Sequence, residues 1–192
     1  GLSYQMIRLL LSPSHKLPNS GQVTMENEIT TKTQDDLFLD TLKDIYYAEK
    51  QIYKSLPKMA RAATSEKLRA AFEKHQDETE GQIARLEQIF ELLDKPARGK
   101  KCDAIEGLLD EGKEIMDDSK GEPALDAGLL AAAQAVEHYE ISRYGTLKTW
   151  AAKLGHGDAV ELLEQTLSEE KKTDDALSKL AETAVNDAAQ SR

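Results

Sequence analysis

The sequence has few of the residues that would tie it to an oxidising compartment, a membrane or a nucleic acid. It has a single cysteine, Cys102, so no disulfide can form within the chain, and we expect a reducing environment. It has no run of 18 apolar residues, so we expect no membrane-spanning helix. Basic residues number 25 against 35 acidic ones, and the formal charge of −10 argues against nucleic acid and anionic membranes as partners.

Prolines are also scarce, and two of the five lie within the first 33 residues, which have no periodic apolar face. We therefore expect residues 1–33 to form a flexible N-terminal arm or extension and residues 34–188 to form the organised domain. The apolar patch at residues 6–11 is too short for a signal-peptide core and contains Arg8. Together with the single cysteine, this predicts a cytoplasmic protein.

What the sequence has instead is helical periodicity in four long segments. Apolar residues recur every three or four positions over about residues 33–63, 65–93, 124–154 and 158–188. A shorter amphipathic pattern lies between the second and third segments, from Ile105 to Met116. With 40% hydrophobic residues, the chain can bury one sizeable core, and the pattern predicts an all-α domain.

The connections between these segments predict how the helices are arranged. The first and second helices, and likewise the third and fourth, are separated by turns of a few residues, so each pair should form an antiparallel hairpin. The link of roughly 28 residues between the hairpins is long enough to cross a bundle and carries the short helix. Two hairpins joined by one long crossover predict a ferritin-like four-helix bundle. Pro57 lies inside the first helix and predicts a kink there.

The two hairpins also resemble each other in sequence. A shift of 91 positions places Glu49 on Glu140, Tyr53 on Tyr144 and Glu78 on Glu169, and the alignment holds without a gap over about 45 positions. The internal repeat supports equivalent places for the hairpins in the bundle.

The third long helix carries carboxylates within its apolar stripe. Glu137 and Glu140 fall between Ala133 and Tyr144, on the face that should pack against the other helices. A buried, unpaired carboxylate costs several kcal/mol unless it is protonated, paired or bound to a cation. This helix therefore predicts a polar site in the core.

The other three long helices each carry a carboxylate or an imidazole near mid-length, and antiparallel hairpins bring these heights together. Five carboxylates and one imidazole suit two divalent cations, iron or alternatively manganese. On the fourth helix, the position on the helical wheel favours Glu170, whereas the repeat aligns Glu169 with Glu78. With Glu170 chosen, the predicted metal ligands are Glu49, His75, Glu78, Glu137, Glu140 and Glu170.

Four strings of the sequence resemble the YciE/YciF-type ferritin-like stress proteins: YYAEKQ, KHQDETEGQIARLE, AVEHYEISRYGTL and TLSEEKK. The likeness extends over about residues 35–185, and EHYEISRYGTL is its most specific part. This resemblance implies a ferritin-like four-helix fold, a homodimer, a di-iron site and a role in the stress response.

The ligand order departs from the general ferritin-like pattern, which has one Glu on each of two helices and Glu-x-x-His on each of the others. Glu49 and Glu140 match it. The second helix has the order His75-x-x-Glu78 instead, and no histidine follows Glu170. At most one imidazole therefore serves the site. Two functions follow from these features: a di-metal protein with ferroxidase or peroxide- or oxygen-reducing activity, or a structural, stress-protective dimer whose metal site is stabilising or vestigial.

Overall fold

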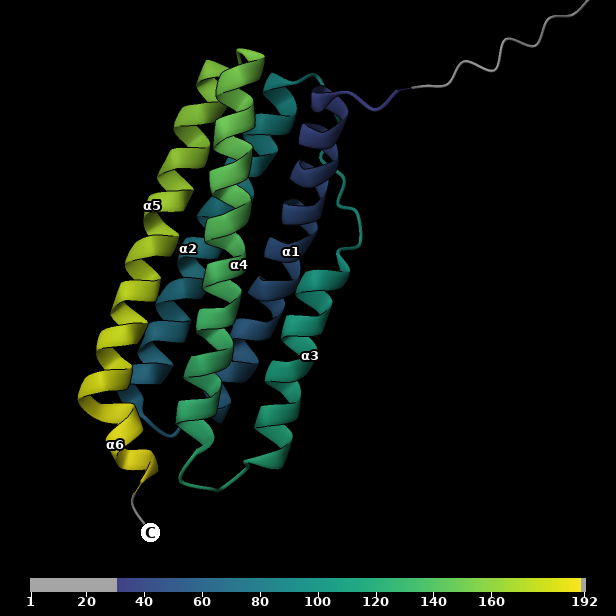
Figure 1. Cartoon of the computed structure of the whole chain (residues 1–192). Coiled ribbons are helices and arrows are strands. Elements are labelled where there is room, and N and C mark those ends of the chain that lie inside the picture. The colour runs from purple at the N-terminus through teal and green to yellow at the C-terminus, as the bar shows by residue number, and fades with distance from the viewer. Residues whose placement is uncertain (1–30, 191–192) are drawn as a thin grey trace, which may run out of the picture. The chain divides into compact units, whose positions relative to one another are not determined.

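Residues 31–190, the part of the chain that the computed structural model describes, contain helices and no strand (Figure 1). The flexible arm expected over residues 1–33 falls almost entirely on residues 1–30, which lie outside the described residues. No helix between residues 31 and 190 has the length and apolar character needed to cross a membrane. The elements are α1 (Gln34–Ala62), α2 (Glu66–Leu92), α3 (Asp103–Asp118), α4 (Leu125–Leu154), α5 (Gly157–Leu180), the π-helical turn η1 (Ala181–Val185) and α6 (Asn186–Ala189).

The first two helices begin where local side chains can cap them. Thr33 accepts a hydrogen bond from the backbone N–H of Asp36, and the Asp36 carboxylate accepts one from the Thr33 N–H, which together form a capping box. Ser65 caps α2 by accepting from the Leu68 N–H at 3.3 Å. The helix starts predicted from the sequence are confirmed. α1 continues through Pro57 as one helix.

The four long helices form a closed bundle. α1 packs against α2 and α4 packs against α5 as hairpins, while α1 also contacts α4 and α2 contacts α5. α3 lies outside this square, along α4 and α1, within the crossover that joins the hairpins (Figure 1). The predicted all-α, ferritin-like four-helix bundle is confirmed.

The last helix differs from the prediction of one continuous helix over residues 158–188. α5 ends at Leu180, and the wider π-helical turn η1 precedes α6. Both Ala181 and Val185, at the two ends of this turn, are buried. The wider turn thus keeps two apolar side chains of the same segment in the core.

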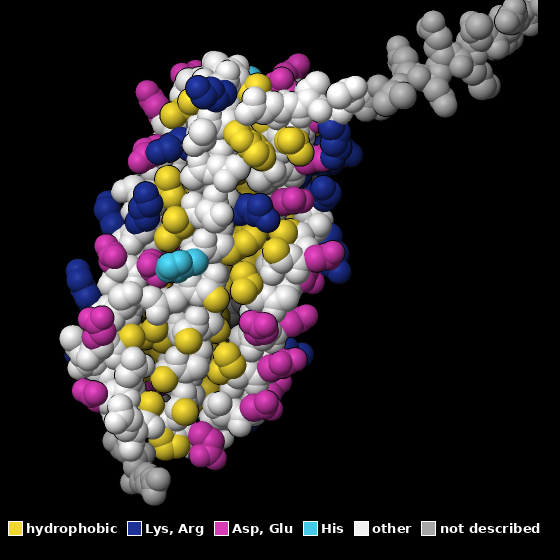
Figure 2. Space-filling model, in the orientation of Figure 1, with side chains coloured by type: hydrophobic (Ala, Val, Ile, Leu, Met, Phe, Trp, Pro, Cys, Tyr) yellow, Lys and Arg dark blue, Asp and Glu magenta, His cyan; other side chains and the backbone are white. Residues whose placement is uncertain are grey.

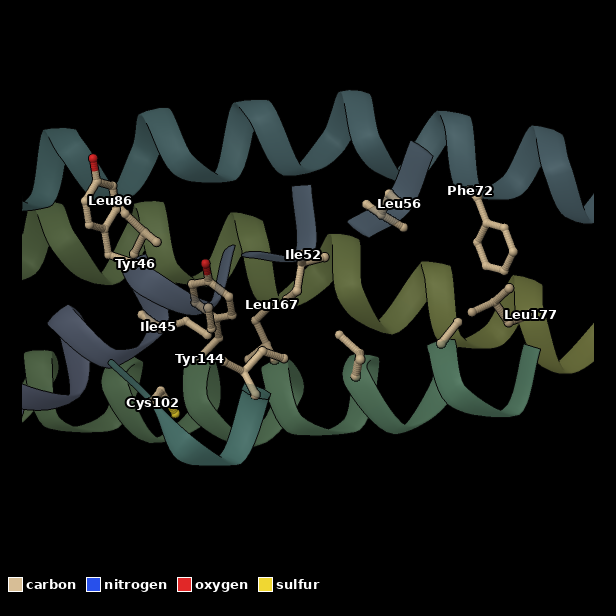
Figure 3. Packing of buried hydrophobic residues seen from close by; sticks show 14 of the residues in the cluster. Ile45, Tyr46, Ile52, Leu56, Phe72, Leu86, Cys102, Tyr144, Leu167 and Leu177 are labelled. Atoms are coloured by element: carbon tan, nitrogen blue, oxygen red, sulfur yellow. The ribbon is translucent and has the colours of Figure 1, made fainter. Parts of the chain in front are cut away.

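The hydrophobic core lies in layers on both sides of the middle of the bundle. Leu56, Phe72 and Leu177 pack toward one end, and Ile45, Tyr46 and Leu86 pack toward the other (Figure 3). All six side chains are buried. Side chains at mid-length are therefore shielded from water along the bundle axis.

Asp126 of α4 holds the turn between α1 and α2. Its buried carboxylate accepts hydrogen bonds from the Thr64 N–H at 2.8 Å, the Thr64 hydroxyl at 2.5 Å and the Ser65 N–H at 2.7 Å. Three donors from the first hairpin thus converge on one residue of the second, and the contact fixes the two hairpins to each other.

We expect Asp126→Ala to lower the free energy of unfolding by about 2–3 kcal/mol, because hydrogen bonds to a charged group are lost and buried donors are left unpaired. Urea unfolding at pH 7 measures this loss. Asp118→Ala, at an exposed position at the end of α3, is the control and should change stability by less than about 0.5 kcal/mol. Equal losses in both variants would contradict a tether at Asp126.

Candidate metal centre

Five acidic or imidazole side chains from all four bundle helices meet at mid-length in the core. α1 supplies one, α2 one, α4 two that are three residues apart, and α5 one. Their exposed fractions lie between 0% and 4%, so none of them has ordinary access to water. They are Glu49, His75, Glu137, Glu140 and Glu170.

Four of these residues already have the spacing of a coordination shell. One ligand atom from each of His75, Glu137, Glu140 and Glu170 lies within 4.8 Å of the others. The Nε2 atom of His75 is 3.2 Å from Oε1 of Glu137. Atoms that share one cation at about 2.1 Å lie no more than about 4.2 Å apart, so a small contraction would bring the four to one ion.

Most polar atoms of this cluster lack hydrogen-bond partners among the described residues. Both ring nitrogens of His75, both carboxylate oxygens of Glu140 and one oxygen each of Glu49, Glu137 and Glu170 are buried without one. Buried polar groups are nearly always hydrogen-bonded, so a set of seven such atoms in one place needs a partner. Carboxylate oxygens and one imidazole are the donor set that divalent iron and manganese accept. The residues present therefore fit a metal site.

Burial changes the protonation of this cluster. It raises the pKa of Glu49 and of Glu137 to about 8, and it raises those of Glu140 and Glu170 well above their usual range. Repulsion between neighbouring carboxylates adds to the rise, chiefly from Glu170 on Glu140 and from Glu137 on Glu170. The cluster is thus expected to hold protons near neutral pH when no cation is bound.

The imidazole of His75 shifts in the opposite sense. Burial lowers its pKa to about 4, so the ring is neutral near pH 7. A neutral imidazole is the form that binds a metal, whereas the carboxyl groups must first release their protons.

Glu49 lies beside the group of four. The Tyr144 hydroxyl donates a hydrogen bond to Glu49 Oε1, and the other carboxylate oxygen of Glu49 has no partner among the described residues. Its raised pKa reflects burial first and then the nearby Glu170. Glu49 is thus oriented by a tyrosine and still has an oxygen to offer a cation.

Glu78, the remaining predicted ligand, lies at the edge of the cluster. It pairs with Lys74 one turn away, its side chain is 25% exposed, and its Oε2 is 4.0 Å from Nδ1 of His75. The structure does not bring Glu78 into the group of four, and its role as a ligand stays a prediction.

The two adjacent glutamates of α5 have different surroundings. Glu170 points into the cluster, while Glu169 receives two hydrogen bonds from the guanidinium of Arg85, at 2.8 and 2.6 Å. The helical-wheel argument for Glu170 agrees with this placement.

Sequence reasoning placed Thr79 and Gln82 on the inward face of the second helix but did not predict their contacts with the cluster. The side-chain amide of Gln82 donates to Glu170 Oε1, and the Thr79 hydroxyl donates to the backbone carbonyl of His75 at 2.8 Å. Under the 91-residue shift, Thr79 is the equivalent of Glu170 and Gln82 the equivalent of Thr173. On α2 the places of a Glu-x-x-His pair are therefore filled by Thr79 and Gln82, and the imidazole comes from His75, about two turns before the histidine place. The internal repeat carried this signal.

Comparison with known proteins finds relatives that align over nearly their whole length and over about four fifths of this chain. The family model described as Domain of unknown function (DUF892) matches residues 33–190. Protein YciF of Escherichia coli (strain K12) is 46% identical over 162 residues, which cover 84% of this chain and 98% of YciF.

Solved structures agree with this relationship. The crystal structure of the E. coli stress protein YciF superimposes with a TM-score of 0.77 at 47% identity, covering 81% of this chain and 99% of that one. YcfI of Rhodopseudomonas palustris, described as a candidate structural protein, gives 0.76 at 46% identity over 79% of this chain and 96% of that one. The resemblance to YciF-type proteins is thereby confirmed, and the chain belongs to the DUF892 family.

Proposed function

We propose that this protein binds two divalent cations, iron in the first place, in the buried cluster and oxidises Fe(II) with peroxide or dioxygen. The observation that carries the proposal is the set of buried ligand atoms at His75, Glu137, Glu140 and Glu170 that have no partner in the described part of the chain, with Glu49 beside them. The E. coli relative is described as a stress protein, which supports a role in the response to stress. Removal of reactive Fe(II) together with peroxide is a chemistry that suits such a role.

Two ions fit the cluster better than one because it has two ends. His75 and Glu137 form one end, at 3.2 Å from each other, and we assign Glu49, which is outside the group of four, to the other. One ligand atom of Glu140 lies within 4.8 Å of those of His75 and Glu137, and burial together with repulsion from Glu170 and Glu49 raises its pKa. Both oxygens of Glu140 lack partners among the described residues, so this side chain would be available as a ligand to either of two cations.

The expected reaction has a simple balance. Two Fe(II) ions give up one electron each, and one peroxide molecule takes both electrons and two protons to form two molecules of water. The carboxyl groups that hold protons near neutral pH in the free site release them when Fe(II) binds, and the neutral imidazole of His75 acts as a ligand. The apolar layers above and below keep bulk water away.

A second function is supported by the incomplete ligand pattern. Only one imidazole lies in the cluster, and the R. palustris relative is described as a candidate structural protein. A cation would then stabilise the bundle without redox chemistry, and the protein would protect the cell as a structural dimer.

We also propose that the chain forms a homodimer in the cytoplasm, as its likeness to the YciF-type proteins implies. Sedimentation equilibrium of the full chain should give twice the mass of 21.3 kDa, and a monomer at micromolar concentration would contradict it.

We expect protein loaded anaerobically with about two Fe(II) per chain to develop a near-ultraviolet ferric absorption when peroxide or dioxygen is added. Glu170→Gln should slow this oxidation by at least about tenfold, because it removes a buried anionic ligand. Glu169→Gln is the matched control, since it changes the adjacent glutamate that faces Arg85, and its rate should stay within about threefold of the wild type. Stopped-flow absorbance measures all three rates.

The outcome separates the two functions. Oxidation no faster than in buffer, with no ferric band, would leave the structural function as the better account. Equal slowing by both glutamine variants would place the metal elsewhere.

A further inference from the structure

A cavity of about 380 Å³ lies between α1, α3 and α4, outside the cluster. Its inner wall is apolar and contains Met59, Leu109, Met116 and Val136, whereas charged residues such as Lys58 and Asp110 lie at its rim. Hydrophobic side chains gather on the surface along the seam between α4 and α3 (Figure 2). The cavity thus offers an apolar interior behind a charged opening.

A smaller chamber of about 20 Å³ continues this cavity inward. The two share Ser55, Met59, Leu109 and Val136 as lining residues. The chamber is also lined by His75 and Glu137, which form one end of the cluster. The space between α3 and the bundle therefore narrows to a neck of four side chains and ends against two of the candidate ligands.

We propose that this cavity and its neck form the route by which a small uncharged oxidant reaches the His75 end of the cluster; the inference rests on the proposed iron oxidation. The chamber has room for about one or two water-sized molecules, which limits the solute to about two heavy atoms. Hydrogen peroxide and dioxygen both meet this size limit. Superoxide is equally small, but its charge excludes it from an apolar route.

The chemistry of the neck selects against ions. Met59, Leu109 and Val136 provide three of its four lining residues, and an ion passing them would lose its hydration without a compensating charge. The Ser55 hydroxyl is the polar group of the neck and can exchange hydrogen bonds with peroxide. Fe(II) is a poor candidate for this path, so blocking it should slow oxidation without weakening Fe(II) binding.

The first test blocks the neck from α3, which carries none of the candidate ligands. Leu109→Trp should slow oxidation of Fe(II)-loaded protein at least tenfold, while anaerobic Fe(II) affinity stays within twofold of the wild type. Glu111→Trp places the same side chain on the exposed face of α3 and should react at the wild-type rate. Ala132→Phe, which narrows the cavity from α4, provides a second blocked variant in case Leu109→Trp does not fold.

Running each variant with peroxide and with dioxygen identifies the oxidant. Slowing with only one of them assigns the route to that molecule, and slowing with both assigns it to any uncharged solute of this size. Wild-type rates with both oxidants in folded Leu109→Trp and Ala132→Phe protein would overturn the proposal.

The second test needs no metal. Dissolved dioxygen is paramagnetic and speeds the relaxation of methyl groups that it reaches in metal-free protein. The methyl groups of Leu56, which lines the chamber and is 3% exposed, should relax faster under oxygen pressure than those of Leu125, which is 4% exposed and does not line it, and Ala132→Phe should remove the excess. No excess in the wild type would overturn the route for dioxygen even if iron is oxidised. An excess without iron oxidation would leave the route standing and remove the proposed function.

Discussion

The metal-free protein is expected to lose stability as the pH rises from about 4.5 to about 8. Burial raises the pKa of Glu49 and Glu137 from 4.5 to about 8, so the folded site keeps protons that the unfolded chain has released. Each such proton lowers the free energy of unfolding by about 1.4 kcal/mol per pH unit across this window. The stability that these bound protons give to the folded protein is therefore fully present below pH 4.5 and is lost by about pH 8.

His75 works in the opposite direction over part of this range. Its pKa falls from 6.5 to about 4 on folding, so the unfolded chain binds the extra proton and stability rises with pH between these values. Up to about pH 6.5 the rise in stability from His75 cancels the loss from one carboxyl group, and above that pH it cancels none of the loss. The steepest loss should consequently lie between about pH 6.5 and 8.

Urea unfolding in the presence of a chelator, at half-unit steps from pH 5 to 8, measures this profile. Adding Mn(II), or Fe(II) without oxygen, should flatten the profile and restore about 2.7 kcal/mol per site at a hundredfold excess over the dissociation constant. Stability that does not change from pH 6.5 to 8 in the chelated protein would contradict a proton-holding cluster.

The helix starts were predictable because they depend on neighbouring residues. Thr33 and Ser65 cap their helices with donors three residues away, which a sequence shows directly. The π-helical turn at Ala181–Val185 was not predictable in this way, since it depends on which side chains the other helices leave room to bury.

The inward-facing glutamates could also be predicted, because a carboxylate inside an apolar stripe conflicts with its surroundings. The repeat conflicts with the helical wheel over Glu169 and Glu170 only if it pairs ligand with ligand. In the structure the repeat pairs Glu169 with Glu78, both at the edge of the cluster, and pairs Glu170 with the buried Thr79. The repeat and the helical wheel therefore agree on which face each residue occupies.

The supporting polar contacts had no local signal. Gln82 lies 88 residues from Glu170, and Arg85 lies 84 residues from Glu169. Asp126 meets Thr64 across 62 residues. Each is an ordinary polar residue on a helix until the hairpins are docked, so only the three-dimensional arrangement shows which of them are buried and paired.

Replacing Glu140 by leucine should make the metal-free protein more stable and should remove most of its response to metal. Glu140 is fully buried, and neither of its oxygens has a hydrogen-bond partner within residues 31–190. Leucine removes this unsatisfied group and fills the space with apolar atoms, a change that stabilises comparable buried ionic sites by about 1–4 kcal/mol. The wild type loses stability toward pH 8, and the variant lacks one of the carboxyl groups whose raised pKa causes this loss. The gain in stability should therefore be larger at pH 8 than at pH 5.

Glu140→Gln separates the two effects. The amide keeps the shape of the side chain but cannot carry the negative charge, and its buried polar atoms remain without partners, so we expect a lost metal response without the gain of the leucine variant. Melting curves of both variants and the wild type, each with chelator and with saturating Mn(II), measure the metal-dependent shift directly. A shift of wild-type size in Glu140→Leu would show that Glu140 binds no metal, and its proposed place as a ligand to either of two cations would have to be given up.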